Sequence, residues 1–361
     1  MKIGIVWLPN VGKSTLFNAL TKNYGADAQN FPFCTIEPNV WIVNVNDERL
    51  EKIRAAVNGA KIIPASCEFT DIAGIVKWAS EGEWMGNKFL ANIREADAIL
   101  QVVRIFENSD IIHVHGQVDP KSDIEVINAE LIIADLETLT KRIQNEAKKA
   151  RSDKDLLEKV KTLELALEWL ESWKLVSSMD WSDEQKSHLR DSHLLTNKKF
   201  VYACNVSEEM MDATSDELKK IIWVEDTHTQ VVPICAKLEE DMLEMSDDEK
   251  KEFLDEMWLT STGLDNLIKA SYDALGLQYY FTAGEQEVRA WTIKKWSSAP
   301  QAAGVIHTDF EKWFIKADVV KASDIIEQGG WSKAREAGKV KLEGKDYIVQ
   351  DGDVMLFKFS K

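Results

Sequence analysis

The stretch Trp7-Leu8-Pro9-Asn10-Val11-Gly12-Lys13-Ser14-Thr15 decides the fold of this chain. It follows the apolar run at residues 3–6, which is typical of a buried β-strand, and it precedes a helical pattern at residues 14–21. A loop between a strand and a helix presents backbone N–H groups and a helix N-terminus to one point, which suits a phosphate group. The stretch therefore predicts a phosphate-binding loop that lacks only the usual first glycine.

The residue types in this loop indicate how a nucleoside triphosphate binds. Lys13 is expected to reach the β- and γ-phosphates and to stabilise the charge of the transition state. The hydroxyl of Ser14 is expected to hold Mg²⁺, a hard cation that takes few protein ligands. The predicted nucleotide-binding residues of the loop are Asn10, Val11, Gly12, Lys13, Ser14 and Thr15.

A second motif, Asp71-Ile72-Ala73-Gly74, follows a strand-like run at residues 66–71. In nucleotide switches, the aspartate of such a motif holds Mg²⁺ through water, and the glycine N–H contacts the γ-phosphate. We therefore add Asp71 and Gly74 to the nucleotide-binding residues. Thr35 is placed to give Mg²⁺ a protein oxygen in addition to that of Ser14; otherwise it is an ordinary loop threonine.

The predicted base-binding segment departs from the guanine pattern. Guanine recognition usually requires Asn-Lys-x-Asp after a later strand, whereas the run at residues 200–204 ends in Asn205-Val206-Ser207-Glu208. Glu208 is one methylene longer than Asp, so a clamp on both guanine N–H groups is misplaced and discrimination is lost. We expect Asn205, Val206 and Glu208 to contact the nucleotide, and adenine to bind at least as well as guanine, through the backbone at Val206.

The residue that orients the attacking water during hydrolysis is harder to identify from the sequence. Many related hydrolases place a glutamine directly after Asp-x-x-Gly to orient the attacking water, but this chain has Ile75, which cannot. His113 is the best candidate for this catalytic role, because histidine donates a hydrogen bond or accepts a proton near neutral pH. The alternative is that His113 only caps its loop.

Charge and composition restrict the partners. The net charge of −17 opposes indiscriminate binding to nucleic acid. Residues 277–361 are an exception, with 13 basic and 12 acidic side chains, so any contact with RNA is expected to be local.

No apolar stretch approaches the length of a membrane span, and no signal peptide is recognisable. We expect a cytoplasmic monomer without membrane contacts or DNA specificity. The four cysteines are widely spaced and are expected to be buried thiols.

Strand-like runs alternate with helical patterns, which indicates an α/β domain with a mostly parallel sheet. Between residues 122 and 197, apolar residues repeat at spacings of three and four, which predicts an inserted antiparallel coiled-coil hairpin. Lys148, Lys149, Arg151 and Lys154 make its tip basic. The tip is either a solvated turn or a docking point for RNA or an acidic partner. We place the first domain at residues 1–276 and a small mixed α/β module at residues 277–361.

These motifs resemble the YchF/Ola1 family, a branch of the Obg-related translation-factor NTPases. The resemblance rests on residues 8–20, on Phe31-Pro32-Phe33-Cys34-Thr35, on Gly86-Asn87-Lys88-Phe89-Leu90, on Asn205-Val206-Ser207-Glu208 and on residues 306–312 and 347–353. It implies a P-loop G domain with a coiled-coil insertion and a C-terminal TGS domain of β-grasp type. It also implies Mg²⁺-dependent hydrolysis of ATP in preference to GTP, association with ribosomes or RNA, and a catalytic role for His113.

One departure from the family pattern concerns tryptophan. Trp7, Trp41, Trp78, Trp84 and Trp313 stand where family members have glycine. Glycine allows tight turns and a close approach of the backbone to a ligand, and an indole does not. Because so many such changes in one chain resist a common functional purpose, we hypothesise that several of the 13 tryptophans reflect how the sequence was recorded or decoded.

The sequence thus favours a Mg²⁺-dependent ATPase that also accepts GTP and acts as a nucleotide-controlled switch. A second hypothesis, which gains weight if Trp7 blocks the pocket, is a binding adaptor that hydrolyses nucleotide only with an activator or not at all. A classical GTPase ranks third, because Asn205-Val206-Ser207-Glu208 lacks the aspartate.

Overall fold

The computed structural model describes residues 2–24, 40–72, 90–106, 118–150, 153–226 and 229–360, which form two compact units. The first unit comprises residues 1–41 and 68–274, and the second comprises residues 42–67 and 275–361. The chain leaves the first unit within β2 (Val40–Asn44) and returns to it within β4 (Ser66–Asp71). We predicted a boundary at residue 276, and no pattern in the sequence indicated that residues 42–67 belong with the C-terminal residues.

The first unit is built on a parallel sheet. Its further strands are β1 (Lys2–Trp7), β5 (Ala98–Arg104), β6 (Lys199–Asn205) and β7 (Gln230–Ile234). The strand order is β2-β4-β1-β5-β6-β7, and β1, β5, β6 and β7 pair in parallel with their neighbours. Every residue of β5 is buried, as expected for a strand covered on both faces. The predicted α/β class with a mostly parallel sheet is confirmed.

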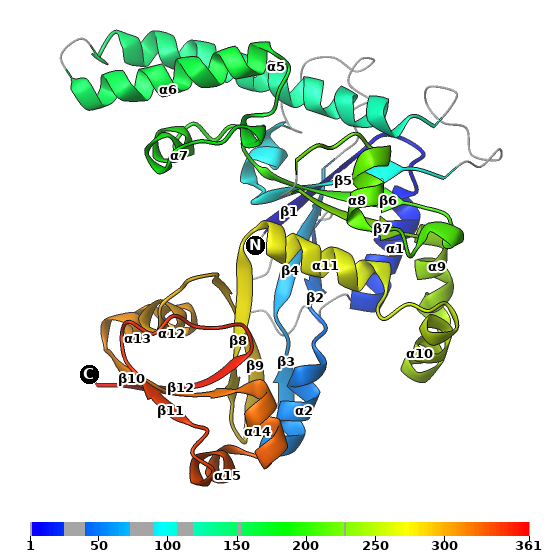
Figure 1. Ribbon diagram of the computed structural model, residues 1–361, viewed down its shortest axis with the longest axis vertical. Helices are drawn as coiled ribbons and strands as arrows, with labels where there is room; N and C mark the ends of the chain where they lie inside the picture. Colours follow the sequence, from blue (N-terminus) through cyan, green and yellow to red (C-terminus); the bar gives the residue numbers. More distant parts are fainter. Residues whose placement is uncertain are drawn as a thin grey trace. The chain divides into compact units, whose positions relative to one another are not determined.

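Helices connect and flank these strands (Figure 1). They are α1 (Lys13–Tyr24), α5 (Pro120–Ala147), α6 (Lys154–Glu171), η4 (Val176–Ser178), α7 (Asp183–Arg190), η5 (Glu208–Met210), α8 (Ser215–Ile221), α9 (Ala236–Asp241), η6 (Met242–Glu244), α10 (Asp247–Glu256) and α11 (Gly263–Ala274). The helical pattern of the sequence at residues 207–220 predicts one helix, but the structure has η5 and α8 there, because Thr214 caps a new helix. None of the described helices is both long enough and apolar enough to cross a lipid bilayer.

The helices α5 and α6 lie side by side as an antiparallel hairpin (Figure 1). Its core includes Ile132, Leu139, Leu163 and Leu170, which belong to the repeats seen in the sequence. Buried Asp135, in the middle of α5, holds the segment that leads from the hairpin to β6. It accepts hydrogen bonds from the backbone N–H groups of Leu195 and Thr196 and from the Thr196 hydroxyl. The predicted helical insertion therefore forms.

The second unit contains a mixed sheet. Its strands are β3 (Lys61–Ile63), β8 (Leu277–Ala283), β9 (Glu287–Lys294), β10 (Phe314–Lys321), β11 (Lys341–Glu343) and β12 (Asp353–Phe359), in the order β11-β10-β12-β8-β9-β3. Its helices are α2 (Glu48–Val57), α12 (Ala299–Ile306), α13 (Thr308–Lys312), α14 (Ala322–Gln328) and α15 (Trp331–Glu336). Residues 42–67 join this unit because β3 pairs in parallel with β9 and α2 packs on α14.

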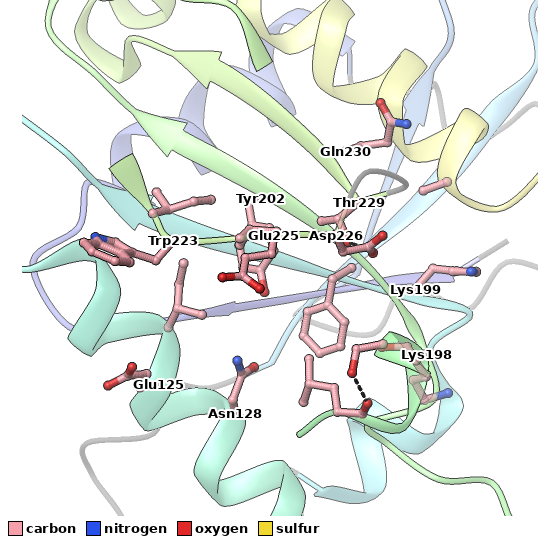
Figure 2. Close-up of a pocket in the computed structure, with 18 of the residues that line it drawn as sticks. Glu125, Asn128, Lys198, Lys199, Tyr202, Trp223, Glu225, Asp226, Thr229 and Gln230 are labelled. Carbon is pink, nitrogen blue, oxygen red and sulfur yellow. Dashed lines mark hydrogen bonds between the residues drawn. The ribbon is translucent and has the colours of Figure 1, made fainter. Parts of the chain in front are cut away.

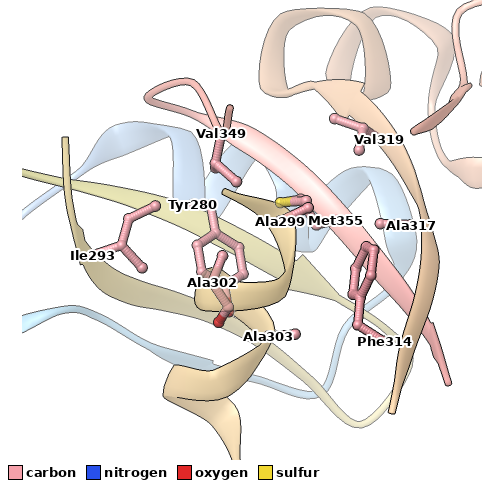
Figure 3. Close-up of a cluster of buried hydrophobic side chains, with 10 residues drawn as sticks. All are labelled: Tyr280, Ile293, Ala299, Ala302, Ala303, Phe314, Ala317, Val319, Val349 and Met355. Carbon is pink, nitrogen blue, oxygen red and sulfur yellow. The ribbon is translucent and has the colours of Figure 1, made fainter. Parts of the chain in front are cut away.

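The core of this unit lies between the sheet and α12 (Figure 3). Tyr280 of β8 is fully buried, and its hydroxyl donates a 2.8 Å hydrogen bond to the Ala302 carbonyl of α12. Phe314, Val319 and Met355 complete the apolar side of the sheet. The apolar pattern of the sequence at residues 345–359 predicts a strand, but β12 begins only at Asp353, because a loop with a left-handed Gly352 precedes it.

Candidate nucleotide-binding site

The phosphate-binding loop lies between the end of β1 at Trp7 and the start of α1 at Lys13. Two of its residues, Asn10 and Gly12, have positive φ angles of 65° and 91°. A Cβ atom at Gly12 would overlap the side-chain amide of Asn205, so glycine is required there by both conformation and space. The loop thus has the tight backbone that its sequence predicted.

Asn205, at the carboxyl end of β6, fixes this loop. Its Nδ2 donates a 2.9 Å hydrogen bond to the Val11 carbonyl, and its Oδ1 accepts one of 3.2 Å from the backbone N–H of Ala236. Because Asn205 is buried, both bonds form away from water, where leaving either group unpaired is costly. The side chain therefore links the phosphate-binding loop to the segment that follows β7.

Lys13 and Asp71 meet at the start of α1. The Lys13 ammonium lies 2.9 Å from Oδ2 of Asp71, at the end of β4. It also lies 4.1 Å from the centre of the Trp7 ring and 5.4 Å from that of Phe17. The structure thus brings together two residues that the sequence assigned to the phosphates and to Mg²⁺.

The Asp71 carboxylate has the features of a ligand for a cation or for its water shell. Its Oδ1 is buried and has no hydrogen-bond partner within the part of the chain that the structure describes. Burial raises the pKa of Asp71, and the hydrogen bond and charge of Lys13 only partly oppose this effect. A buried carboxylate oxygen without a hydrogen-bond partner, on the side chain that pairs with Lys13, fits a hydrated Mg²⁺, which favours oxygen ligands.

At the predicted base-binding segment, Glu208 forms an exposed ion pair with Lys237, with 3.0 Å between Oε1 and Nζ. The hydrogen bond and charge of Glu208 raise the pKa of Lys237. The backbone N–H of Val206 donates to the Ile234 carbonyl at 2.9 Å and is not available to a base. We predicted that adenine binds through the backbone at Val206, and of that backbone only the carbonyl oxygen can still accept a hydrogen bond from the base.

Three predicted site residues, Thr35, Gly74 and His113, lie outside the described residues. The backbone of Ser14 is part of α1, and Thr15 beside it is half-buried. The roles given to these residues stay predictions.

Arg104, the last residue of β5, contacts the phosphate-binding loop although it was not among the predicted site residues. Its guanidinium is buried and donates hydrogen bonds to the carbonyls of Asn10, at 3.4 Å, and Phe106, at 3.1 Å. The available signal was a single charged residue at the end of an otherwise uncharged strand.

A cavity of about 630 Å³ in the first unit lies at the opposite end of the strands (Figure 2). Lys199 and Gln230, the first residues of β6 and β7, line it together with Glu125, Tyr202 and Trp223. Ligands of parallel sheets bind at the carboxyl ends of the strands, so this cavity is separate from the candidate nucleotide site.

Two family models match the chain. A model described as a 50S ribosome-binding GTPase (MMR_HSR1) matches residues 2–141, and the YchF-GTPase_C model, described as a protein of unknown function (DUF933), matches residues 277–360. Together with the loop between β1 and α1, they define a P-loop nucleoside-triphosphate hydrolase of the α/β class.

Curated relatives match over almost the full chain. The "Ribosome-binding ATPase YchF" of Bacillus subtilis is 52% identical over 99% of this chain and 98% of its own length, and that of Escherichia coli O157:H7 is 51% identical over 99% of both. The chain belongs to the YchF family.

Solved structures agree with this assignment. The Schizosaccharomyces pombe YchF GTPase superposes with a TM-score of 0.86 at 37% identity, covering 99% of this chain and 97% of that one. A GTP-binding protein from Pyrococcus horikoshii OT3 has a TM-score of 0.62 at 21% identity over both full chains, which supports the fold alone.

Proposed function

We propose that the protein is a Mg²⁺-dependent ATPase that also accepts GTP, associates with the ribosome in the cytoplasm and changes its switch segments with the bound nucleotide. The observation that carries the proposal is the contact of Lys13 with Asp71 beside a loop held by Asn205. The names of the relatives, ribosome-binding ATPases, support the same activity and partner.

In this proposal the chain supplies binding and electrostatic stabilisation. Lys13 leaves Asp71 to contact the β- and γ-phosphates, and the loop amides face the same oxygens. Ser14, Thr35 and Asp71, the last through water, would hold Mg²⁺, which neutralises phosphate charge when bound. His113 would orient the attacking water, because Ile75 cannot.

The preference for ATP rests on the base-binding segment. Glu208 is paired with Lys237 and is longer than the aspartate that clamps guanine. Competition of ATP and GTP for a fluorescent nucleotide, with and without Mg²⁺, tests this point. We expect ATP to compete at least as well as GTP, and a clear preference for GTP would contradict the proposal.

Hydrolysis and binding must be measured separately. A His113→Ala variant should bind ATP normally and release phosphate more slowly, whereas release at the parental rate would remove His113 from the mechanism. Binding without any release by the parental protein would favour the adaptor that needs an activator.

Ribosome association is tested by sedimentation of purified ribosomes with the full chain in the presence of ATP, ADP or no nucleotide. We expect the bound fraction to depend on the nucleotide. Equal binding in all three conditions would contradict a nucleotide-controlled switch.

A further inference from the structure

Arg104 contacts the phosphate-binding loop from the carboxyl end of β5. Its guanidinium is only 1% exposed and donates to the Asn10 carbonyl, while its neighbour in the sheet register, Asn205, donates to the next carbonyl, that of Val11. Two adjacent strand ends therefore hold two consecutive carbonyls of the loop.

This arrangement determines where the loop amides point. In a trans peptide the C=O and N–H groups point in opposite directions. The peptides after Asn10 and Val11 turn their carbonyls toward Arg104 and Asn205, so the N–H groups of Val11 and Gly12 point away from these strand ends. That is the direction a phosphate requires for binding by loop amides.

Arg104 also acts on two other segments. It donates to the Phe106 carbonyl and lies 4.6 Å from the centre of the Phe106 ring. Asp123, buried in the first turn of α5, attracts it electrostatically and opposes the effect of burial, which lowers the pKa of Arg104. In the sequence, Phe106 and α5 flank the segment that contains His113.

We propose that Arg104 is a positioning residue that sets the phosphate-binding loop and ties it to both flanks of the His113 segment. It does not touch the nucleotide. This inference rests on the proposed nucleotide hydrolysis for its kinetic consequence, but its structural consequence is measurable without nucleotide.

The test uses Arg104→Met, which keeps most of the side-chain length, and Arg104→Met with Asp123→Asn, which also removes the buried negative charge that attracts Arg104. Arg142→Met is the matched control, because Arg142 also pairs with a carboxylate and a carbonyl, within the helical hairpin. Hydrogen exchange without nucleotide reports on the amides of residues 10–12. ATP affinity and turnover report on function.

We expect faster exchange at Val11 and Gly12 and about tenfold weaker ATP binding in both Arg104 variants, but not in the control. Arg104→Lys, which keeps the charge, should restore part of the affinity. Unchanged exchange in the folded double variant would overturn the inference. If the parental protein binds no nucleotide, the proposed function fails, and the exchange result still decides the role of Arg104.

A separate observation concerns the tryptophans. Among the described residues other than glycine, seven have positive φ angles, and four of these are Trp173, Trp223, Trp258 and Trp296, with φ between 57° and 70°. The left-handed region favours glycine and asparagine, and a bulky aromatic side chain is an outlier there.

Three of these tryptophans occupy the position just after a helix C-cap. The residue after each of these tryptophans donates its backbone N–H to a carbonyl in the last turn of the helix. The three bonds run from Lys174 to Trp169, from Val224 to Lys219 and from Leu259 to Leu254. After α15, the same bond runs from Lys339 to Ala334 around Gly338, whose φ is 70°. Tryptophan thus occupies, at three helix ends of this chain, a left-handed position that proteins usually fill with glycine.

The exposure and hydrogen bonding of the side chains also divide the tryptophans into two groups. The four left-handed ones are 62% to 93% exposed. In contrast, Trp169, Trp181, Trp291 and Trp331 each donate a hydrogen bond from the indole N–H to another residue. Trp7, Trp41 and Trp313 have no positive φ, so their backbone conformation does not indicate whether glycine belongs there. Trp78 and Trp84 lie outside the described residues.

We infer that glycine occupies positions 173, 223, 258 and 296 in the native protein, because the cell decodes as glycine a codon that is read here as tryptophan. Glycine at position 7 by the same decoding would restore the first glycine of the phosphate-binding loop and remove the ring that lies over Lys13.

Two measurements test this inference. The gene should carry one codon at the four left-handed positions and another at the four hydrogen-bonded tryptophans. Peptide mass spectrometry of the protein from its own cells should find glycine at positions 173 and 258. Tryptophan in those peptides would overturn the inference.

Discussion

Lys13 and Asp71 form an ion pair with 2.9 Å between Nζ and Oδ2, although 58 positions separate them in the chain. The pair joins the start of α1 to the end of β4, the two places that contact phosphate and Mg²⁺ in the proposed function. Triphosphate binding must break or rearrange this contact, because Lys13 cannot serve both partners equally. The pair is therefore a direct target for mutation.

Asp71→Asn removes the carboxylate while keeping the size of the side chain. We expect the affinity for MgATP to fall by about 10- to 100-fold, because a hydrated metal ion loses its anionic partner. The affinity for ATP in EDTA should not fall, because the substitution also frees Lys13 from the ion pair that competes with the phosphates. Calorimetry with and without Mg²⁺ measures both quantities. Asp97→Asn is the control, since Asp97 is an exposed aspartate that accepts a hydrogen bond from the N–H of Lys2, and equal losses in the two variants would contradict the prediction.

Glu239 predicts a pH-dependent stability. It is buried, its Oε1 accepts a 3.2 Å hydrogen bond from Leu264, and burial raises its pKa from 4.5 to about 7. Between these values the folded state binds the proton and the unfolded state does not. The free energy of unfolding should therefore fall as the pH rises from about 4.5 to 7, by on the order of 2–3 kcal/mol.

Glu239→Gln keeps the hydrogen-bond acceptor and cannot ionise. Its free energy of unfolding should lack this decline, so the difference from the parental protein grows with pH and becomes constant above about pH 7. Urea unfolding at a series of pH values measures it. The exposed neighbour provides the control Glu240→Gln, and parallel pH profiles for the parental protein and Glu239→Gln would refute the assignment.

The nucleotide loop was predictable because its signal is local. A strand, a short loop with Gly12-Lys13-Ser14 and a helix follow one another in the chain, and the structure has that order. The heptad stripes of the helical hairpin were equally local, and Ile132 and Leu163 are buried as that pattern requires.

Contacts between distant segments were not predictable. The three residues of β3 carry too little pattern to indicate pairing with β9, so residues 42–67 were placed in the wrong unit of structure. Arg104 was missed because an arginine at a strand end usually faces solvent. Its burial follows from the Asn10 and Phe106 carbonyls, which only the folded chain brings together.

Trp258→Gly should stabilise the protein. The side chain is 93% exposed and φ is 58°, so little burial is lost and the strain of a left-handed tryptophan is removed. We expect a gain of about 1 kcal/mol in the free energy of unfolding, after the greater chain entropy of glycine is subtracted. Trp181→Gly should instead lose about 3–5 kcal/mol, because Trp181 is buried and bonded to Val176. Chemical denaturation measures both, and a loss of stability in Trp258→Gly would contradict the strain argument.

Glu208→Asp tests the origin of base selectivity. The shorter side chain draws the carboxylate back by one methylene, toward the position that accepts both guanine N–H groups, and it weakens the contact with Lys237, now 3.0 Å. Hydrogen bonds from guanine to a carboxylate are charge-assisted, so we expect the affinity for GTP relative to ATP to rise about tenfold. Glu209→Asp, at the adjacent exposed position, should leave the ratio unchanged. Competition of both triphosphates for one fluorescent nucleotide gives the ratio directly. If it stays constant in Glu208→Asp, the length of this side chain does not set the preference, and recognition must come from the backbone carbonyl of Val206 or from the segment after β7.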